Sequence, residues 1–399
     1  MTAKTTSRGK VLVTGASIAG PTVAYWLNRY GFDVTVVEKA PTIRTGGYPI
    51  DVRGPALEVV RRMGLLQRLR EAEVDTNRAV FLNADGSVLV TTHPHQVVGS
   101  ITGHDVELPR GELTKALYDA ARDDVQFVFG DHIEALEQHD DGVDVTFHGG
   151  DSRRFDVVVS GEGIHSHTRE LVFGPEQRFH RFLGYCFAVF SMPNDFGIDR
   201  EVVMWTDVRR AAAIYPSGNE GEVFGFFTFA VPEVPYYAFH DVEAQRKMVR
   251  EVYAGAGWEV PKLVAAMQEA DDIFFDTVSQ IRMPRWTSGR VALVGDAAHA
   301  PSFLTGQGTS LSLISSYMLA RSLRDNPDVA SAFAAYERDT REFAALNQGL
   351  IDESAAALFP TTEEELREHN ERLSKLTTMP GSEGRPEYSA ITLPPEPGE

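Results

Sequence analysis

The strongest constraint on the fold lies at the start of the chain, where a strand, a glycine-containing turn, a helix and a second strand follow one another. The β-branched run Lys10–Thr14 predicts a strand, and residues 15–20 read Gly-Ala-Ser-Ile-Ala-Gly. Pro21–Tyr30 then carries apolar residues at helical spacing, and Val34–Val37 predicts a second buried strand. A βαβ unit of this kind predicts a parallel sheet and an α/β fold.

The turn has the context of a dinucleotide-binding fingerprint. Gly15 permits the tight turn, Gly20 permits close packing of helix on strand, and Ser17 stands where the strict pattern has its middle glycine. The free N–H groups at the helix N-terminus suit a pyrophosphate. Glu38 follows Gly20 by 18 positions and is placed to accept hydrogen bonds from a ribose. This motif alone fits NAD and FAD equally well.

A second glycine-rich segment far downstream favours FAD. The apolar run Val291–Val294 predicts a buried strand that ends at Gly295-Asp296, and Gly306 and Gly308 precede another helix. The strand brings the Asp296 carboxylate to the edge of the sheet, where it could hold a polyol. The amides of Thr309 and Ser310 at the helix N-terminus could hold the edge of a flavin ring.

Aromatic residues gather in the middle of the chain. The segment from Phe182 to Phe239 holds 14 of the 39 aromatic residues, in a stretch that reads as mostly β. Along Val223–Ala230, strand alternation places Phe224 and Phe226 on one face and Phe227 on the other. This pattern fits either a sheet core or the wall of a substrate cavity.

Composition excludes several classes of function. A net charge of −19 argues against a nucleic-acid surface. The single cysteine, Cys186, allows no internal disulfide and no cysteine-built metal site, and we expect it to be a buried packing residue. No apolar stretch is long enough to span a bilayer, so we expect a cytoplasmic protein without a membrane span. The pairs His93/His95 and His165/His167 have no evident third ligand, and we predict no metal site.

Three segments, in order and spacing, resemble the class A flavoprotein monooxygenases, the para-hydroxybenzoate hydroxylase-like family. The turn at 15–20 is similar to the family's ADP-binding turn. Residues 156–169, with Gly161-Glu162-Gly163, Ser166 and Arg169, resemble its Asp-Gly segment, and Gly295-Asp296 its Gly-Asp segment. Within the family, the opening turn and residues 46–54 are most similar to aromatic-polyketide hydroxylases and tetracycline-inactivating monooxygenases. Two positions depart from the pattern: Glu162 replaces an aspartate, and Phe303 stands where a proline is expected.

The resemblance assigns roles to particular residues. Arg110 matches the arginine beside the ribityl chain, Asp296 the ribityl-binding aspartate, and Arg53 the segment beside the flavin ring. The predicted cofactor-binding set is Gly15, Ala16, Ser17, Ile18, Ala19, Gly20, Glu38, Lys39, Arg44, Arg53, Arg110, His132, Ile133, Asp296, Gly306, Gly308 and Thr309. The predicted substrate-binding set is Phe224, Phe226, Phe303 and Leu304. No catalytic side chain is predicted, because the flavin carries the chemistry.

The length of 399 residues suits one large interrupted domain or two domains. We predict a Rossmann-like FAD-binding domain with an inserted, mostly β substrate domain and C-terminal helices. The expected boundaries are 1–174 for the first part of the FAD-binding domain (a few strands near 75–105 belonging to the substrate domain), 175–285 for the substrate domain, 286–350 for the second part, and 351–399 for a C-terminal helix and a frayed tail.

The resemblance implies hydroxylation of an aromatic or polycyclic phenolic small molecule, such as an antibiotic-type polyketide, through a C4a-hydroperoxyflavin. FAD stays bound, NADPH or NADH binds transiently, and O2 is the second substrate. We expect a monomer or a homodimer. A flavoprotein that sequesters an aromatic compound and an FAD-dependent reductase on the same fold are the alternatives. The absence of a Trp-x-Trp-x-Ile-Pro segment argues against a halogenase, and Gly295-Asp296 argues against a nicotinamide dehydrogenase.

Overall fold

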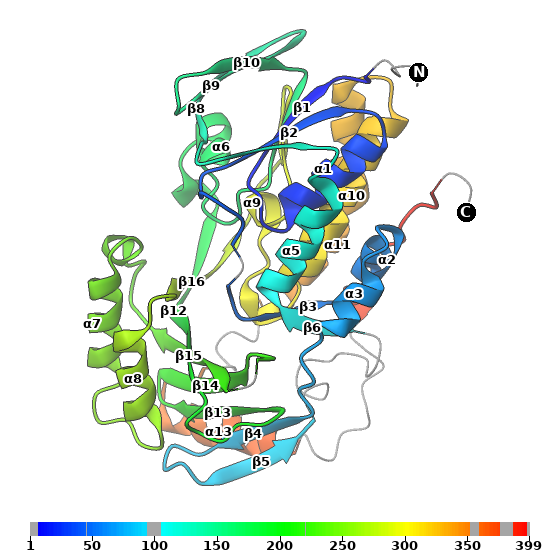
Figure 1. Ribbon diagram of the computed structural model, residues 1–399. Helices are drawn as coiled ribbons and strands as arrows, with labels where there is room; N and C mark the ends of the chain where they lie inside the picture. Colours follow the sequence, from blue (N-terminus) through cyan, green and yellow to red (C-terminus); the bar gives the residue numbers. More distant parts are fainter. Residues whose placement is uncertain are drawn as a thin grey trace.

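The computed structural model describes residues 7–44, 46–93, 105–219, 221–351, 359–375 and 386–396. Its first layer is a six-stranded sheet (Figure 1). The order is β17 (Thr287–Ser288), β18 (Val291–Leu293), β11 (Val157–Ser160), β1 (Lys10–Thr14), β2 (Asp33–Glu38) and β7 (Gln126–Phe129). All neighbours pair in parallel except β17 with β18. The predicted α/β fold with a parallel sheet is therefore confirmed.

The strands of this sheet are apolar because both of its faces are covered. On one face Val11 and Val13 pack in the core formed with the helices α1 (Ala19–Arg29), α5 (Arg110–Ala121), α10 (Gly308–Asp325) and α11 (Val329–Gly349). On the other face Leu12 packs under a three-stranded antiparallel sheet. That sheet consists of β8 (Ile133–His139), β9 (Gly142–Phe147) and β10 (Ser152–Phe155). β9 pairs antiparallel with β8 on one side and with β10 on the other.

The second large sheet has seven strands (Figure 1). The order is β16 (Phe274–Ile281), β12 (His180–Pro193), β15 (Glu222–Ala230), β14 (Arg210–Pro216), β13 (Glu201–Asp207), β4 (Arg78–Leu82) and β5 (Val88–Thr92). Helices α7 (Val242–Val252) and α8 (Val260–Glu269) cover one face. Although β4 and β5 precede the inserted segment in sequence, β4 pairs in parallel with β13. Within the range 75–105, in which substrate-domain strands were predicted, residues 94–104 lie outside the described residues.

Shorter elements complete the fold. These are β3 (Pro49–Val52), paired with β6 (Val106–Pro109), and the helices α2 (Pro55–Arg62), α3 (Leu66–Glu71), α6 (His167–Phe173), α9 (Asp296–His299) and α13 (Glu363–Ser374). Helix α13 is capped at its N-terminus, since the Thr362 hydroxyl accepts a hydrogen bond from the Glu365 N–H. The prediction of a frayed tail is wrong for 386–396, where Tyr388 is buried and Glu396 makes side-chain hydrogen bonds.

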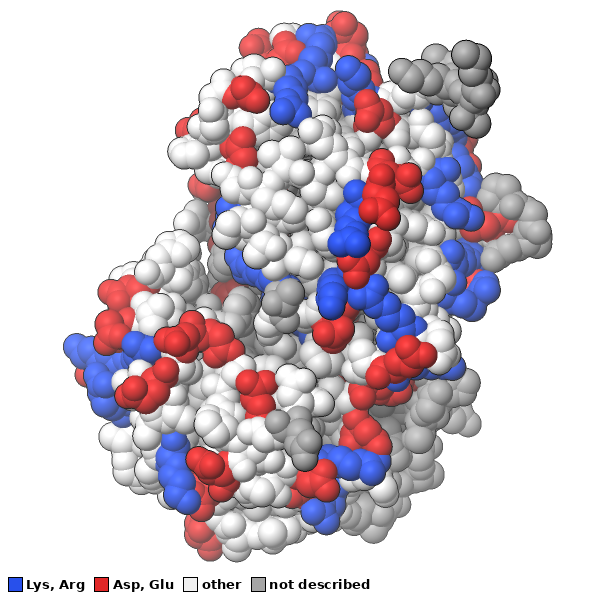
Figure 2. Space-filling view, in the orientation of Figure 1, with Lys and Arg blue, Asp and Glu red and all other residues white. Residues whose placement is uncertain are grey.

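The surface carries both signs of charge. In Figure 2, lysine and arginine side chains lie among aspartate and glutamate side chains on the visible face. No helix in the described part of the chain is both long and apolar enough to cross a membrane.

Candidate functional site

One cavity of about 1840 Å³ extends from the turn after β1 to the inner face of the seven-stranded sheet. All the predicted site residues line it except Gly20 and Ile133. Gly20 packs against the turn itself, and the Ile133 side chain is fully buried between the hairpin and the parallel sheet. The sequence motifs, which lie far apart in the chain, thus meet around one space.

The turn after β1 is a close-packed backbone crossing. A Cβ on Gly20 would lie 1.8 Å from the carbonyl oxygen of Gly15. Gly15 has φ +89°, and a Cβ there would lie 2.7 Å from the carbonyl oxygen of Gly161. Only glycine meets both conditions. Gly161 belongs to the second family segment, so the two motifs form one packed unit at the N-terminus of α1.

Glu38 at the end of β2 holds two backbone N–H groups in place. Its carboxylate accepts hydrogen bonds from the Ala16 N–H at 2.8 Å and the Ala40 N–H at 2.9 Å. It also lines the cavity beside the N-terminus of α1, where Ile18 provides no side-chain cap. The helix therefore offers free N–H groups to an anionic ligand next to a hydrogen-bond acceptor for a ribose.

Arg110 and Asp296 lie further along the cavity. The Arg110 guanidinium donates a hydrogen bond to the Ser17 hydroxyl at 3.0 Å, so the serine that replaces the motif's middle glycine positions this arginine. Asp296 is the first residue of α9. The pKa of its carboxyl group is raised, mainly by burial. Arg110 lowers this pKa and Asp276 raises it further. A buried carboxylate of this kind is stabilised by hydroxyl donors from a ligand.

Aromatic side chains form the opposite wall. Phe303 contacts Phe187, with ring centroids 4.4 Å apart, and Phe226 at 5.6 Å. Phe187 stacks on Phe226 at 5.8 Å. Ser302, directly before Phe303, has φ +81°, an uncommon and strained conformation for a residue with a Cβ. The residue that departs from the family's proline therefore contributes a ring to the wall.

Three ionisable residues, Arg53, Asp51 and Glu107, lie beside this wall. Arg53 is 2% exposed and pairs with Asp51 at 2.9 Å. Its Nε and Nη1 have no hydrogen-bond partner among the described residues. Glu107 lies nearby, and its pKa is raised to about 8, mainly by burial and then by Asp51. Asp51 and Glu107 meet because β3 pairs with β6, a non-local pairing that no sequence signal indicated.

The contacts of Glu162 account for a glutamate at the position where the family has an aspartate. Its carboxylate accepts hydrogen bonds from the Ser166 hydroxyl at 2.8 Å, the Thr168 N–H at 2.8 Å and the Thr168 hydroxyl at 2.9 Å. The longer side chain reaches across its loop to the N-terminus of α6, where a carboxylate is favourable. Glu162 therefore organises the loop that packs on the turn after β1.

His165, which lies in the loop before α6 and lines the cavity, connects this loop to β16. Its ring nitrogens lie 2.9 Å from Glu176 and 3.2 Å from Asp276 on β16. Burial by itself lowers the pKa of His165, but hydrogen bonds to Asp276 and Glu176 raise it to about 9. The imidazole is therefore protonated at neutral pH and bridges two carboxylates.

This bridge makes stability depend on pH. Because the pKa is raised from 6.5 to about 9, its contribution is fully present below about 6.5 and is lost as the pH rises through about 9. We expect wild type to melt above His165→Gln at pH 6, and this gap to shrink by pH 10. Thermal melts of both proteins across that range measure it, and a gap that stays constant would contradict the assignment.

The residues present fit FAD. The glycine crossing, the uncapped start of α1 and Glu38 provide for a pyrophosphate and a ribose, and Asp296 and Arg110 for a polyol. Arg53 also lines the cavity, paired with Asp51 at 2.9 Å, and brings a buried positive charge beside the space that the cofactor would occupy.

Comparisons with known proteins agree with this fit. Residues 8–347 match the FAD binding domain family. A flavin-dependent monooxygenase from an unknown prokaryotic organism is 38% identical over 90% of this chain and 94% of its own length. The crystal structure of tetracycline destructase Tet(55) superimposes with a TM-score of 0.83 at 34% identity, covering 99% of this chain and 100% of that one. Klebsiella pneumoniae HpxO, solved with FAD and uric acid, shares the fold at 22% identity with a TM-score of 0.74, covering 94% and 97%.

Proposed function

The chain belongs to the FAD binding domain family of flavin-dependent monooxygenases, and on that premise we propose that it hydroxylates an aromatic or polycyclic phenolic small molecule, with NAD(P)H as the electron donor. The observation that carries this proposal is the continuity of the cavity of about 1840 Å³. The cavity joins the glycine turn at one end to the aromatic wall at the other without a break. A bound cofactor and a planar substrate would therefore share one continuous space.

FAD, when bound, supplies the capacity to accept a hydride and to activate O2. The chain's residues supply binding, orientation and protection from water. The uncapped start of α1 and Glu38 would bind the adenosine diphosphate half. Arg110, held by Ser17, and Asp296 would orient the other half. The rings of Phe187 and Phe226 would exclude water from the reacting centre, which limits wasteful loss of activated oxygen.

A polyketide of the tetracycline type is the substrate class that we favour. The support is the similarity to tetracycline destructase Tet(55), which extends over nearly the whole of both chains. The volume of the cavity, the stacked rings of Phe187 and Phe226 and the tilted ring of Phe303 beside them also suit a flat polycyclic ligand.

Anaerobic reduction of the purified protein tests this proposal. We expect bound flavin absorption that NADPH or NADH bleaches, and bleaching at least about tenfold faster with one member of a panel of polycyclic phenols and tetracyclines. The control is a panel of aliphatic alcohols. Flavin that is reduced equally fast with every compound would favour a reductase, and a ligand that binds without product in air would favour sequestration.

A further inference from the structure

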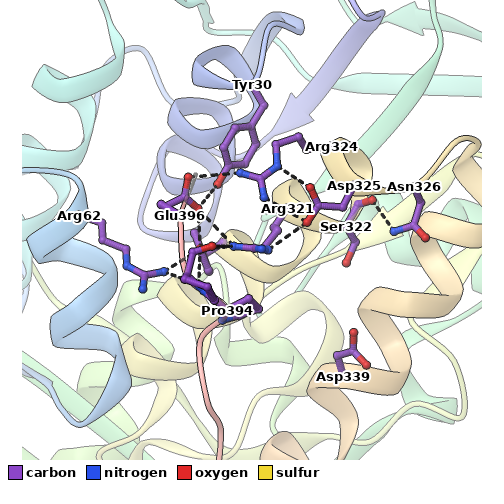
Figure 3. Close-up of polar contacts among 12 residues, drawn as sticks. Tyr30, Arg62, Arg321, Ser322, Arg324, Asp325, Asn326, Asp339, Pro394 and Glu396 are labelled. Atoms are coloured by element: carbon purple, nitrogen blue, oxygen red, sulfur yellow. Dashed lines mark hydrogen bonds and ion pairs between the residues drawn. The ribbon is translucent and has the colours of Figure 1, made fainter. Parts of the chain in front are cut away.

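The C-terminal segment 386–396 crosses the helices of the FAD-binding half and ends beside α1 and α10 (Figure 3). It begins with the turn Pro386–Ser389. Ile391 and Leu393 pack against the core under the parallel sheet, and the Asn347 amide donates to the Glu387 carbonyl at 3.0 Å. The segment is thus attached along its length, and its two ends make the most specific contacts.

Glu396 fastens the outer end. Its Oε1 accepts hydrogen bonds from the Tyr317 hydroxyl at 2.6 Å and the Tyr30 hydroxyl at 2.7 Å. Arg324 donates to Oε2 at 3.3 Å, and Arg321 lies 3.6 Å from Oε1 (Figure 3). Burial raises the pKa of Glu396, but the two tyrosine hydrogen bonds and the arginines outweigh it and keep the pKa below its usual value. One carboxylate therefore connects α1, α10 and the tail.

A second contact locks the backbone next to Glu396. The Arg62 guanidinium, on α2, donates to the Pro394 carbonyl at 2.7 Å, and the Tyr317 hydroxyl lies 3.2 Å from the same oxygen. Arg62 also stacks over the Tyr317 ring, with its Cζ 5.6 Å from the ring centroid. None of these residues lines the cavity.

The inner end of the segment reaches the cavity. Tyr388 is buried, lines the cavity and lies with its ring centroid 5.5 Å from the Arg53 guanidinium carbon. The backbone of Tyr388 passes close to Gly54: a Cβ on Gly54 would lie 2.5 Å from the Tyr388 carbonyl oxygen. Gly54 precedes α2 with φ +53°, so the backbone next to Arg53 is shaped to admit the tail.

We propose that residues 386–396 form a strap that Glu396 fastens and that positions Arg53 through Tyr388. Arg53 is packed between Asp51 and Tyr388, with the Asp105 carboxylate 3.9 Å from its Nε, and this packing fixes the position of the guanidinium where it lines the cavity. Tyr388 is a positioning residue and Glu396 is its remote anchor. The proposal rests on the proposed function only in identifying the ligand near Arg53 as FAD.

Glu396→Ala tests the anchor, with Glu342→Ala as the matched control, since Glu342 is an exposed carboxylate on α11. In hydrogen exchange of the FAD-free proteins, we expect Glu396→Ala to raise exchange both in 386–396 and in 50–56. We also expect its Kd for FAD to rise about tenfold, with no change for Glu342→Ala. Faster exchange confined to the tail, with an unchanged Kd, would overturn the strap.

Tyr388 provides the second arm. Tyr388→Ala should raise the Kd for FAD as much as Glu396→Ala, whereas Tyr388→Phe, which keeps the ring over Arg53, should stay near wild type. Because both residues act through one strap, Tyr388→Ala combined with Glu396→Ala should be no worse than either alone. Fully additive effects would contradict the strap. Failure of wild type itself to bind FAD would instead contradict the proposed function.

Discussion

Replacing Gly20 by alanine is expected to abolish FAD binding and to lower the free energy of unfolding by about 3 kcal/mol. The added Cβ would lie 1.8 Å from the Gly15 carbonyl oxygen, a backbone atom that cannot rotate away. Gly15 cannot retreat either, because its own Cα faces the Gly161 carbonyl. Relief requires α1 to move off β1, which displaces the helix N-terminus that faces the cavity.

Gly349→Ala is the matched control for this experiment. Gly349 ends α11 on the surface, and nothing lies within 4 Å of the site of its Cβ. We expect its stability to change by less than about 1 kcal/mol, with FAD bound as in wild type. Urea unfolding and the ratio of flavin to protein absorbance measure both variants. A Gly20→Ala protein that retains FAD and wild-type stability would show that the turn is not packed as described.

Phe226→Ala and Phe227→Ala, adjacent in β15, should give opposite phenotypes. Phe227 is fully buried against Tyr253, with ring centroids 4.5 Å apart, so its truncation should cost about 3–5 kcal/mol of stability. Phe226 faces the cavity, and its truncation should cost much less stability. It opens a gap in the wall next to Phe303, so we expect more NAD(P)H oxidation to end as hydrogen peroxide.

Urea unfolding and the yield of peroxide per NAD(P)H oxidised measure this pair. Each variant serves as the control for the other, since the same side chain is removed from the same strand. Equal losses of stability in both, or an unchanged peroxide yield in Phe226→Ala, would contradict the assignment of one face of β15 to the core and the other to the cavity.

The opening βαβ unit could be predicted because its signals are local. Strand alternation, helical spacing and two glycines five residues apart each specify their own segment. The same alternation correctly separated Phe226 from Phe227, and the second motif placed Asp296 at a strand end. The division of the chain into domains stays a prediction, although the strands on which it depends are now placed.

What could not be predicted depends on contacts between distant segments. The pairing of β4 with β13 and of β3 with β6 has no local signature, so the meeting of Asp51 and Glu107 was not foreseen. The tail was misjudged because its proline- and glutamate-rich composition resembles disordered segments. Its order comes from partners such as Tyr30 and Tyr317, which lie far away in sequence.

Incorporation of labelled oxygen tests the central claim most directly. Purified protein with FAD, NADPH or NADH, and the phenol that accelerates flavin reduction is incubated under ¹⁸O₂, and the product is analysed by mass spectrometry. The account predicts a product that carries one ¹⁸O atom, with little hydrogen peroxide. Unchanged substrate, with all of the consumed oxygen recovered as hydrogen peroxide, would contradict it.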